Sequence, residues 1–177
     1  MEKVNKLLDI MEQKYPEIYK HSERVAMMCY EFGKKFDIDS VDRETLYIAG
    51  FLHEVGKCNF DKEIKIGKDL VSLDNVYPLF SKAVICNLGD YDRIADIVSQ
   101  HMENLDGSGY PSGLDVNNIH LYAIMLHLCD FYDSCRMNGD SHNSATAKIR
   151  KQTDIMFPKK MITPFIKMLI TDELDLW

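Results

Sequence analysis

Apolar side chains recur at intervals of three and four residues along most of the chain, which is the spacing of one face of a helix. The segments with this spacing are, in order, about 1–14, Pro16 to about Phe36, about 43 to His53, Phe80–Leu88, about 93 to His101, Ile119 to about Arg136, Ala145–Thr153 and Pro158–Leu169. The alternation typical of strands is absent throughout. The pattern therefore predicts an all-α fold, a bundle of helices around one core.

Polar and turn-forming residues separate these segments. Asp37–Asp42 offers caps for the third helix, Gly56 is a plausible stop for it, and Asp90–Asp92 should cap the helix that leads to His101. Cys58–Tyr77 is less regular and is expected to form short helices and loops, with Pro78 as a further break.

No repeat, linker or low-complexity tract interrupts the chain. We therefore expect a single domain over 1–177, with a short N-terminal helix at about 1–14, a core at about 15–137 and C-terminal helices at about 144–177.

Composition narrows the possible functions. The 177 residues are enough for one full hydrophobic core, and 46% of them are hydrophobic. The formal net charge of −7 disfavours general nucleic-acid binding, which needs a basic surface. A small phosphate ligand held by a few local cations remains compatible with this charge.

The five cysteines are an odd number and form no Cys-x-x-Cys pair, so a disulfide framework or zinc ribbon is not expected. A reducing cytoplasm fits this usage. The N-terminus has no long apolar run, so neither a signal peptide nor a membrane span is expected.

Five polar side chains stand among the apolar positions of four predicted helices: His21, His53, Glu54, His101 and Asp130. A lone inward-facing histidine is usually a hydrogen-bonded core residue. Three histidines and two carboxylates in one small core would be costly to bury apart, and a bound cation would pair them all. Nitrogen and oxygen ligands suit iron, manganese, nickel or zinc, and do not select one of them.

The run from His101 to Pro111 is the most specific stretch. Ile94, Ile97 and Val98 precede His101 at helical spacing, which places it on the inner face of a helix, in its last turns. The Asp-Gly-Ser-Gly segment that follows should end the helix, because its glycines adopt positive φ easily. Tyr110-Pro111 then forms a rigid aromatic loop beyond an inward-facing histidine, which is one way to build a pocket.

This run resembles the loop of the HD-GYP family, cyclic-dinucleotide phosphodiesterases within the HD superfamily. That family has His-His-Glu, two variable residues, Asp-Gly, one variable residue and Gly-Tyr-Pro, and this chain departs only at Met102. The order His21, His53-Glu54, Asp130 is similar to the superfamily's metal-ligand set, and Asp133 completes a D-x-x-D helix. The resemblance covers roughly Glu17 to Leu169 and implies an HD-domain helical bundle.

The resemblance also implies roles for individual residues. His21, His53, Glu54, His101 and Asp130 would be metal ligands, and Glu17 falls where some members hold a further metal. Asp130 would act in catalysis together with Lys57, which matches the lysine that contacts phosphate. The substrate-binding residues would be Lys57, Gly109, Tyr110, Pro111 and Arg24, although a structural ion pair is the favoured role for Arg24.

Three departures concern the metals. Glu54 replaces an aspartate, Tyr77 stands where the family has a third histidine, and Met102 replaces the second histidine of the pair. A phenol with an ordinary pKa of about 10 and a thioether are poor ligands for these metals. Tyr77 and Met102 stand where the family binds its second metal, so we expect one divalent metal (iron, manganese, nickel, zinc or magnesium) or none.

Three functions stay open from the sequence. The first is a phosphodiesterase acting on a cyclic dinucleotide such as cyclic di-GMP. The second is a catalytically inactive signalling or interaction domain, and the third is a one-metal nucleotide phosphohydrolase. Regulation would come from a homodimer or from a separate sensory partner, with no membrane involved.

Overall fold

The computed structural model describes residues 2–58, 63–66 and 69–171. Its elements, in chain order, are α1 (Glu2–Lys14), α2 (Pro16–Lys34), α3 (Ser40–Leu52), the 3-10 turn η1 (Val55–Lys57), β1 (Glu63–Ile66), β2 (Asp69–Ser72), α4 (Leu73–Cys86), α5 (Asp92–Gln100), α6 (Leu121–Met137), α7 (His142–Lys151) and α8 (Lys159–Thr171). The all-α class is confirmed. The predicted C-terminal helices extend to position 177, and 172–177 lie outside the described residues.

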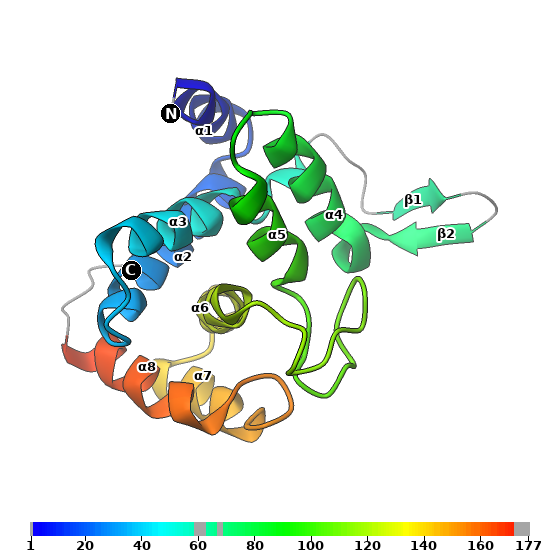
Figure 1. The fold of residues 1–177 in the computed structure, drawn as a ribbon. Coiled ribbons are helices and arrows are strands. Elements are labelled where there is room, and N and C mark those ends of the chain that lie inside the picture. Colours follow the sequence, from blue (N-terminus) through cyan, green and yellow to red (C-terminus); the bar gives the residue numbers. More distant parts are fainter. Residues whose placement is uncertain (1, 59–62, 67–68, 172–177) are drawn as a thin grey trace.

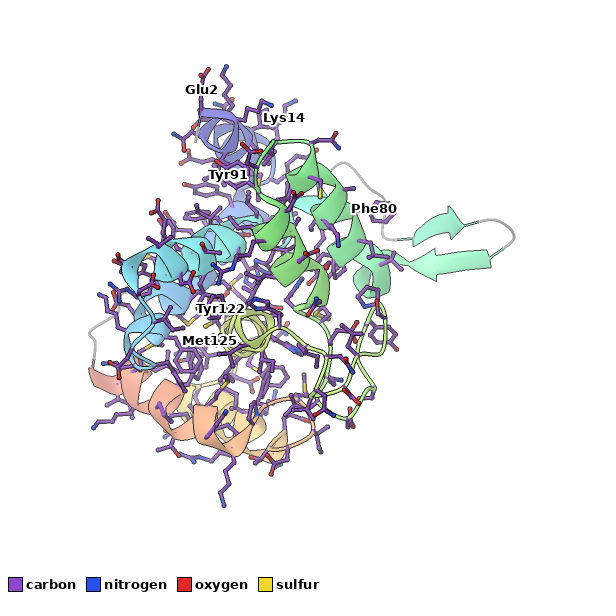
Figure 2. The ribbon with its side chains drawn as sticks, in the orientation of Figure 1. Glu2, Lys14, Phe80, Tyr91, Tyr122 and Met125 are labelled. Carbon is purple, nitrogen blue, oxygen red and sulfur yellow. The ribbon has the colours of Figure 1, made fainter. Side chains whose placement is uncertain are left out.

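Helix α6 is the centre of the fold. Figure 1 shows it nearly end-on, with α2 and α3 on one side, α4 and α5 on another, and α7 and α8 below. Most of its side chains are buried, which is expected of a helix surrounded by others. Figure 2 places Tyr122 and Met125 of α6 in the middle of the molecule, whereas Glu2 and Lys14 of α1 lie at its edge.

Helices α2 and α3 pack closely because Gly50 faces the backbone of α2. A Cβ built on Gly50 would lie 2.6 Å from the Cα of Ala26 and 2.9 Å from its nitrogen. A larger side chain at this point would therefore push the two helices apart. This contact sets the distance between His21 on α2 and His53 at the end of α3.

The segment before α4 differs from the expectation. Strands β1 and β2 form a two-stranded antiparallel sheet in which Ile66 pairs with Asp69, and Figure 1 shows these two strands projecting from the body of helices. The expectation of short helices and loops in this segment is thus wrong at 63–66 and 69–72. The alternation Glu-Ile-Lys-Ile spans only four residues, which is too short to stand out as a periodic pattern.

Helix α4 begins earlier than predicted and contains Pro78 in its second turn. Pro78 was expected to interrupt helical structure here, and that expectation is wrong. A proline at this position removes one backbone hydrogen bond of the helix. Burial of Tyr77 and Pro78 offsets that loss.

The predicted N-terminal cap is present in α3 and absent in α5. Asp39 caps α3 as expected, with its carboxylate accepting the N–H groups of Val41 and Asp42 at 2.9 Å. The expected cap of α5 within Asp90–Asp92 is absent, since Tyr91 takes the N-cap position without a side-chain hydrogen bond. The nearby Asp92 lies in the first turn, where its charge favours the helix dipole. No helix in the described part of the chain combines the length and apolar character needed to cross a membrane.

Candidate metal centre

His21 is oriented by an ion pair on its outer side. Its Nδ1 donates to Oδ2 of Asp133 at 2.7 Å. The same carboxylate accepts two hydrogen bonds of 2.8 Å from the guanidinium of Arg24, one turn further along α2. Asp133 is fully buried, so these partners compensate the loss of its hydration. Because Nδ1 is used in this way, Nε2 of His21 faces the interior of the molecule.

His53 and Glu54 follow directly after the last residue of α3. His53 donates from Nδ1 to the carbonyl of Gly50 at 2.7 Å, which leaves its Nε2 only 3.2 Å from Nε2 of His21. In its neutral form, each imidazole therefore carries its proton on Nδ1 and presents an unprotonated Nε2 to the interior. This neutral form is the one that binds metals.

Gly56 has a different role from the one predicted. Helix α3 already ends at Leu52, so Gly56 is not its stop. A Cβ on Gly56 would lie 2.4 Å from the carbonyl oxygen of Tyr77, and its N–H donates to Ser81 Oγ at 2.9 Å. Ser81 in turn donates to the carbonyl of His53 at 2.7 Å. The glycine therefore allows α4 to approach and fix the backbone that carries His53 and Glu54.

Asp130 completes the group from α6. Its Oδ1 lies 3.2 Å from Nε2 of His21 and 3.8 Å from Nε2 of His53. The hydroxyl of Ser134, one turn further on, donates to the same oxygen at 3.2 Å. His21, His53, Glu54 and Asp130 are all buried, and their ligand atoms lie within 4.8 Å of one another.

The electrostatics of this group favour a cation. Burial lowers the pKa of His21, but hydrogen bonds to Asp130 and Asp133 and nearby negative charges raise it more, to about 10. Burial also raises the pKa of Asp130, yet its hydrogen bonds and charge interactions with His21 and His53 hold that pKa well below its ordinary range. The carboxylates thus keep a proton on His21, and a divalent metal would take the place of that proton.

The donor set fits such a metal. Two histidine nitrogens and two carboxylates are ligands that iron, manganese, nickel and zinc accept, and both histidines have their second nitrogen held by an acceptor. When bound, the metal would polarise a phosphate oxygen or activate water.

His101 is placed next to this group but is not one of its four members. Its Nδ1 donates to the carbonyl of Val98 at 2.6 Å, so its Nε2 is an acceptor. The hydroxyl of Tyr77 donates to that nitrogen at 2.8 Å. Burial, and then the charge of His53, lower the pKa of His101 to about 3. His101 is the C-cap residue of α5, so the inward position is as predicted while the helix ends just before it.

The loop after His101 is held from inside by Glu103. Its two carboxylate oxygens accept the N–H groups of Ser112 at 2.6 Å and Leu114 at 2.9 Å. Gly109 packs on the backbone at the start of the loop, where a Cβ would lie 2.2 Å from the nitrogen of Asn104. Tyr110 is 47% exposed, and Pro111 is half-buried.

An open pocket of about 350 Å³ leads to the metal group. The residues that line it are Glu17, Ile18, His21, Glu54, Lys57, Ser134, Met137 and Asn138. Glu17 is exposed and sits at this pocket, outside the four-residue group. Arg24 is engaged by Asp133, in agreement with its favoured structural role. Tyr110 and Pro111 are not among the residues that line the pocket.

Sequence reasoning left out three residues of this arrangement. Ser134 orients Asp130, Glu103 holds the loop, and Ser81 fixes the backbone of His53. Ser134 lies one helical turn after Asp130, a spacing that the sequence does display. Ser81 acts through a backbone group distant along the chain, for which a single sequence carries no signal. Glu103 is a specified position of the run from His101 to Pro111, but that run does not reveal its contacts with Ser112 and Leu114.

Comparisons with known proteins agree with this geometry. A family model described as "HD domain" matches residues 5–156, which include all four members of the metal group. The 3′3′-cGAMP-specific phosphodiesterase 3 of Vibrio cholerae is 28% identical over 152 residues, covering 83% of this chain and 33% of that protein. A cyclic di-GMP phosphodiesterase of Thermotoga maritima is 22% identical over 176 residues, covering 90% and 46%. The chain thus spans less than half the length of these curated relatives.

Solved structures share the fold. A Vibrio cholerae cyclic GMP-AMP phosphodiesterase superposes with a TM-score of 0.74 at 14% identity, covering 96% of this chain and 47% of that one. The HD domain of the phosphodiesterase PgpH from L. monocytogenes, in complex with cyclic-di-AMP, gives 0.68 at 13% identity and covers 97% of both chains. With the HD-domain match spanning most of its length, this chain belongs to the HD-domain family and has the phosphohydrolase fold of relatives named as cGAMP and cyclic di-GMP phosphodiesterases.

Proposed function

We propose that the chain is an HD-GYP-type domain that holds one divalent metal and binds a cyclic dinucleotide beside it, without the two-metal hydrolysis of intact members. The observation that carries this proposal is the hydrogen bond from the Tyr77 hydroxyl to Nε2 of His101. The resemblance puts a second-metal ligand at the position of Tyr77, and here the phenol instead occupies the one ring nitrogen of His101 that is not bonded to the backbone. Met102, at the other departure from the motif, offers only a thioether.

One candidate metal position remains, with Glu54 in place of the family's aspartate. His21, His53, Glu54 and Asp130 supply two nitrogens and two carboxylates from α2, the end of α3 and α6. Lys57 lines the same pocket, with its side chain 27% exposed, and would contact a phosphate oxygen of the ligand. Tyr110 at the loop would stack on a base, a contact worth about 1–3 kcal/mol per base. Two-metal enzymes clamp the attacking and leaving oxygens together, and one metal supplies only part of that clamp.

Calorimetric titration of cyclic di-GMP, cyclic GMP-AMP and cyclic di-AMP into the manganese-loaded protein tests this function. We expect binding of at least one of them that disappears in His53→Ala, and no linear product when the mixture is followed by chromatography. An intact HD-GYP phosphodiesterase serves as the positive control for hydrolysis. Failure to bind any cyclic dinucleotide, or turnover comparable with the control, would contradict the proposal.

The size of the pocket favours a second candidate, a one-metal hydrolase of a nucleoside phosphate. The pocket of about 350 Å³ lies at the lower end of the roughly 300–1,000 Å³ usual for small-molecule sites, which suits one nucleotide better than two. A panel of nucleoside monophosphates and triphosphates, assayed for metal-dependent phosphate release, separates this candidate from the first.

A further inference from the structure

Tyr77 packs against His101 beside the metal group, at the sequence position where the resemblance puts a ligand of a second metal. The residue is only 2% exposed, and its ring lies against the imidazole of His101 with centroids 5.5 Å apart. Its hydroxyl donates to Nε2 of His101 at 2.8 Å. A phenol with its proton on the only inward nitrogen of His101 leaves that nitrogen without a lone pair for a cation.

Lys57 lies on the face of the same ring. Its Nζ is 4.2 Å from the ring centroid of Tyr77, within the range of a cation–π interaction. The ammonium also contacts Oε1 of Glu54. That oxygen is 3.8 Å from Nε2 of His21. Glu54 therefore has His21 of the metal group on one side and the positive charge of Lys57 on the other.

We propose that the Lys57 ammonium, held on the ring of Tyr77, is a built-in substitute for the second metal. It neutralises the outer side of Glu54, a buried carboxylate that would otherwise be costly to keep charged. It also keeps a positive charge at the pocket, where a phosphate oxygen of the ligand would lie. This inference rests on the proposed one-metal function.

The Lys57 ammonium, in contact with Glu54, should weaken binding of the first metal, an effect that a lysine on the open surface would not have. A positive charge in contact with Glu54 competes with the metal for that carboxylate and repels the metal itself. Removing the charge should therefore tighten metal binding, even though it removes a side chain from the site. If Lys57 is merely a solvated helix end, its removal leaves the metal affinity unchanged.

The test measures manganese affinity by calorimetry on the full chain. We expect Lys57→Met to bind Mn²⁺ about 3- to 10-fold more tightly than the wild type, as expected for removal of a nearby like charge. Lys82→Met is the matched control, because the Lys82 side chain is 41% exposed and pairs with Asp96 at 2.7 Å away from the metal group, and we expect no change there. An unchanged or weaker affinity in Lys57→Met would overturn the inference.

The number of bound metals gives an independent readout. Elemental analysis after loading and gel filtration should find one Mn²⁺ in the wild type and in Lys57→Met, and two in the variant that combines Lys57→Met with Tyr77→His and Met102→His. Two metals in the variant with Tyr77→His and Met102→His alone would show that Lys57 does not take the second position, and one metal in the folded variant with all three changes would also overturn the inference. A wild type without Mn²⁺ would instead refute the proposed function together with the inference, so the two failures are distinguishable.

Discussion

Glu103 illustrates, at the scale of a single residue, how a motif position can serve the shape of a site. The residue is 2% exposed, and its carboxylate accepts two backbone N–H groups from the loop that carries Tyr110. The carbonyl of the same residue lies 3.1 Å from Nδ1 of the buried His127. One side chain therefore joins the start of the loop to its end, next to the inner face of α6.

The variant Glu103→Gln should lose about 1–3 kcal/mol of unfolding free energy, because one amide N–H of the loop would face an NH₂ group in place of an acceptor. Urea denaturation measures this change. Asp106→Asn is the control: Asp106 is exposed, and its Oδ1, which accepts from the N–H and hydroxyl of Ser108, has a counterpart in asparagine. Equal stabilities for wild type and Glu103→Gln would show that the carboxylate does not hold the loop.

Gly109 packs directly on the backbone at the start of the loop. Gly109→Ala would place a Cβ 2.2 Å from the nitrogen of Asn104 and 2.5 Å from the Cα of Glu103, and backbone atoms cannot move aside cheaply. We expect a loss of about 1–3 kcal/mol of unfolding free energy, typical of overpacking. Gly33→Ala meets only the flexible side chain of Arg43 and improves helix propensity, so thermal unfolding should find it close to wild type. A larger loss for Gly33→Ala than for Gly109→Ala would contradict this reasoning.

At the scale of elements, helices α3, α5 and α6 are joined by a small cluster of polar side chains. Asp42 of α3 pairs with Arg93 of α5, one contact being 3.0 Å, and accepts the hydroxyl of Tyr122 from α6. These groups join elements that also carry or position the metal ligands. Hydrogen bonds from Arg93, and then from Tyr122, lower the pKa of Asp42.

A lowered folded pKa means that Asp42 stabilises the fold above its ordinary pKa of about 3.9 and loses this contribution as the pH falls through the folded value. At pH 7, Asp42→Asn should therefore be less stable than wild type by up to about 1 kcal/mol, the usual size for partly exposed pairs. Below about pH 4 the difference should shrink. Asp9→Asn, at an exposed position of α1, should show little change at either pH, and a difference for Asp42→Asn that grew towards acid would contradict the assignment.

The metal group depends, at the scale of the whole molecule, on residues 109 positions apart along the chain. His21, His53 with Glu54, and Asp130 come from three elements that meet only in the folded protein. A ligand that binds this arrangement and not the unfolded chain stabilises the fold by mass action.

Manganese at 100 times its dissociation constant should add about 2.7 kcal/mol of unfolding free energy, which corresponds to a rise in Tm of about 5–10 °C for a chain of this size. Differential scanning calorimetry with and without a chelator measures the rise. His53→Ala should abolish it. His142→Ala, which removes a histidine near Tyr132, should keep it, and an equal response of both variants would place the metal elsewhere.

The parts of the fold that the sequence predicted are those with a local cause. Helical spacing placed His21 and Asp130 on inward faces, and the cap of α3 falls within the predicted range Asp37–Asp42. The strands at 63–66 and 69–72 were too short to show a period, and the extent of α4 was hidden by Pro78. The pairing of Tyr77 with His101 depends on how α4 packs beside the end of α5, and that of Arg24 with Asp133 on how α2 meets α6. Such tertiary contacts leave no trace in a single sequence.

An anomalous-scattering map from crystals loaded with manganese tests the central claim most directly. We predict one peak per chain, enclosed by His21, His53, Glu54 and Asp130, with the Tyr77 hydroxyl still bonded to His101. No peak among these four residues, or a second peak beside Nε2 of His101, would contradict the one-metal account.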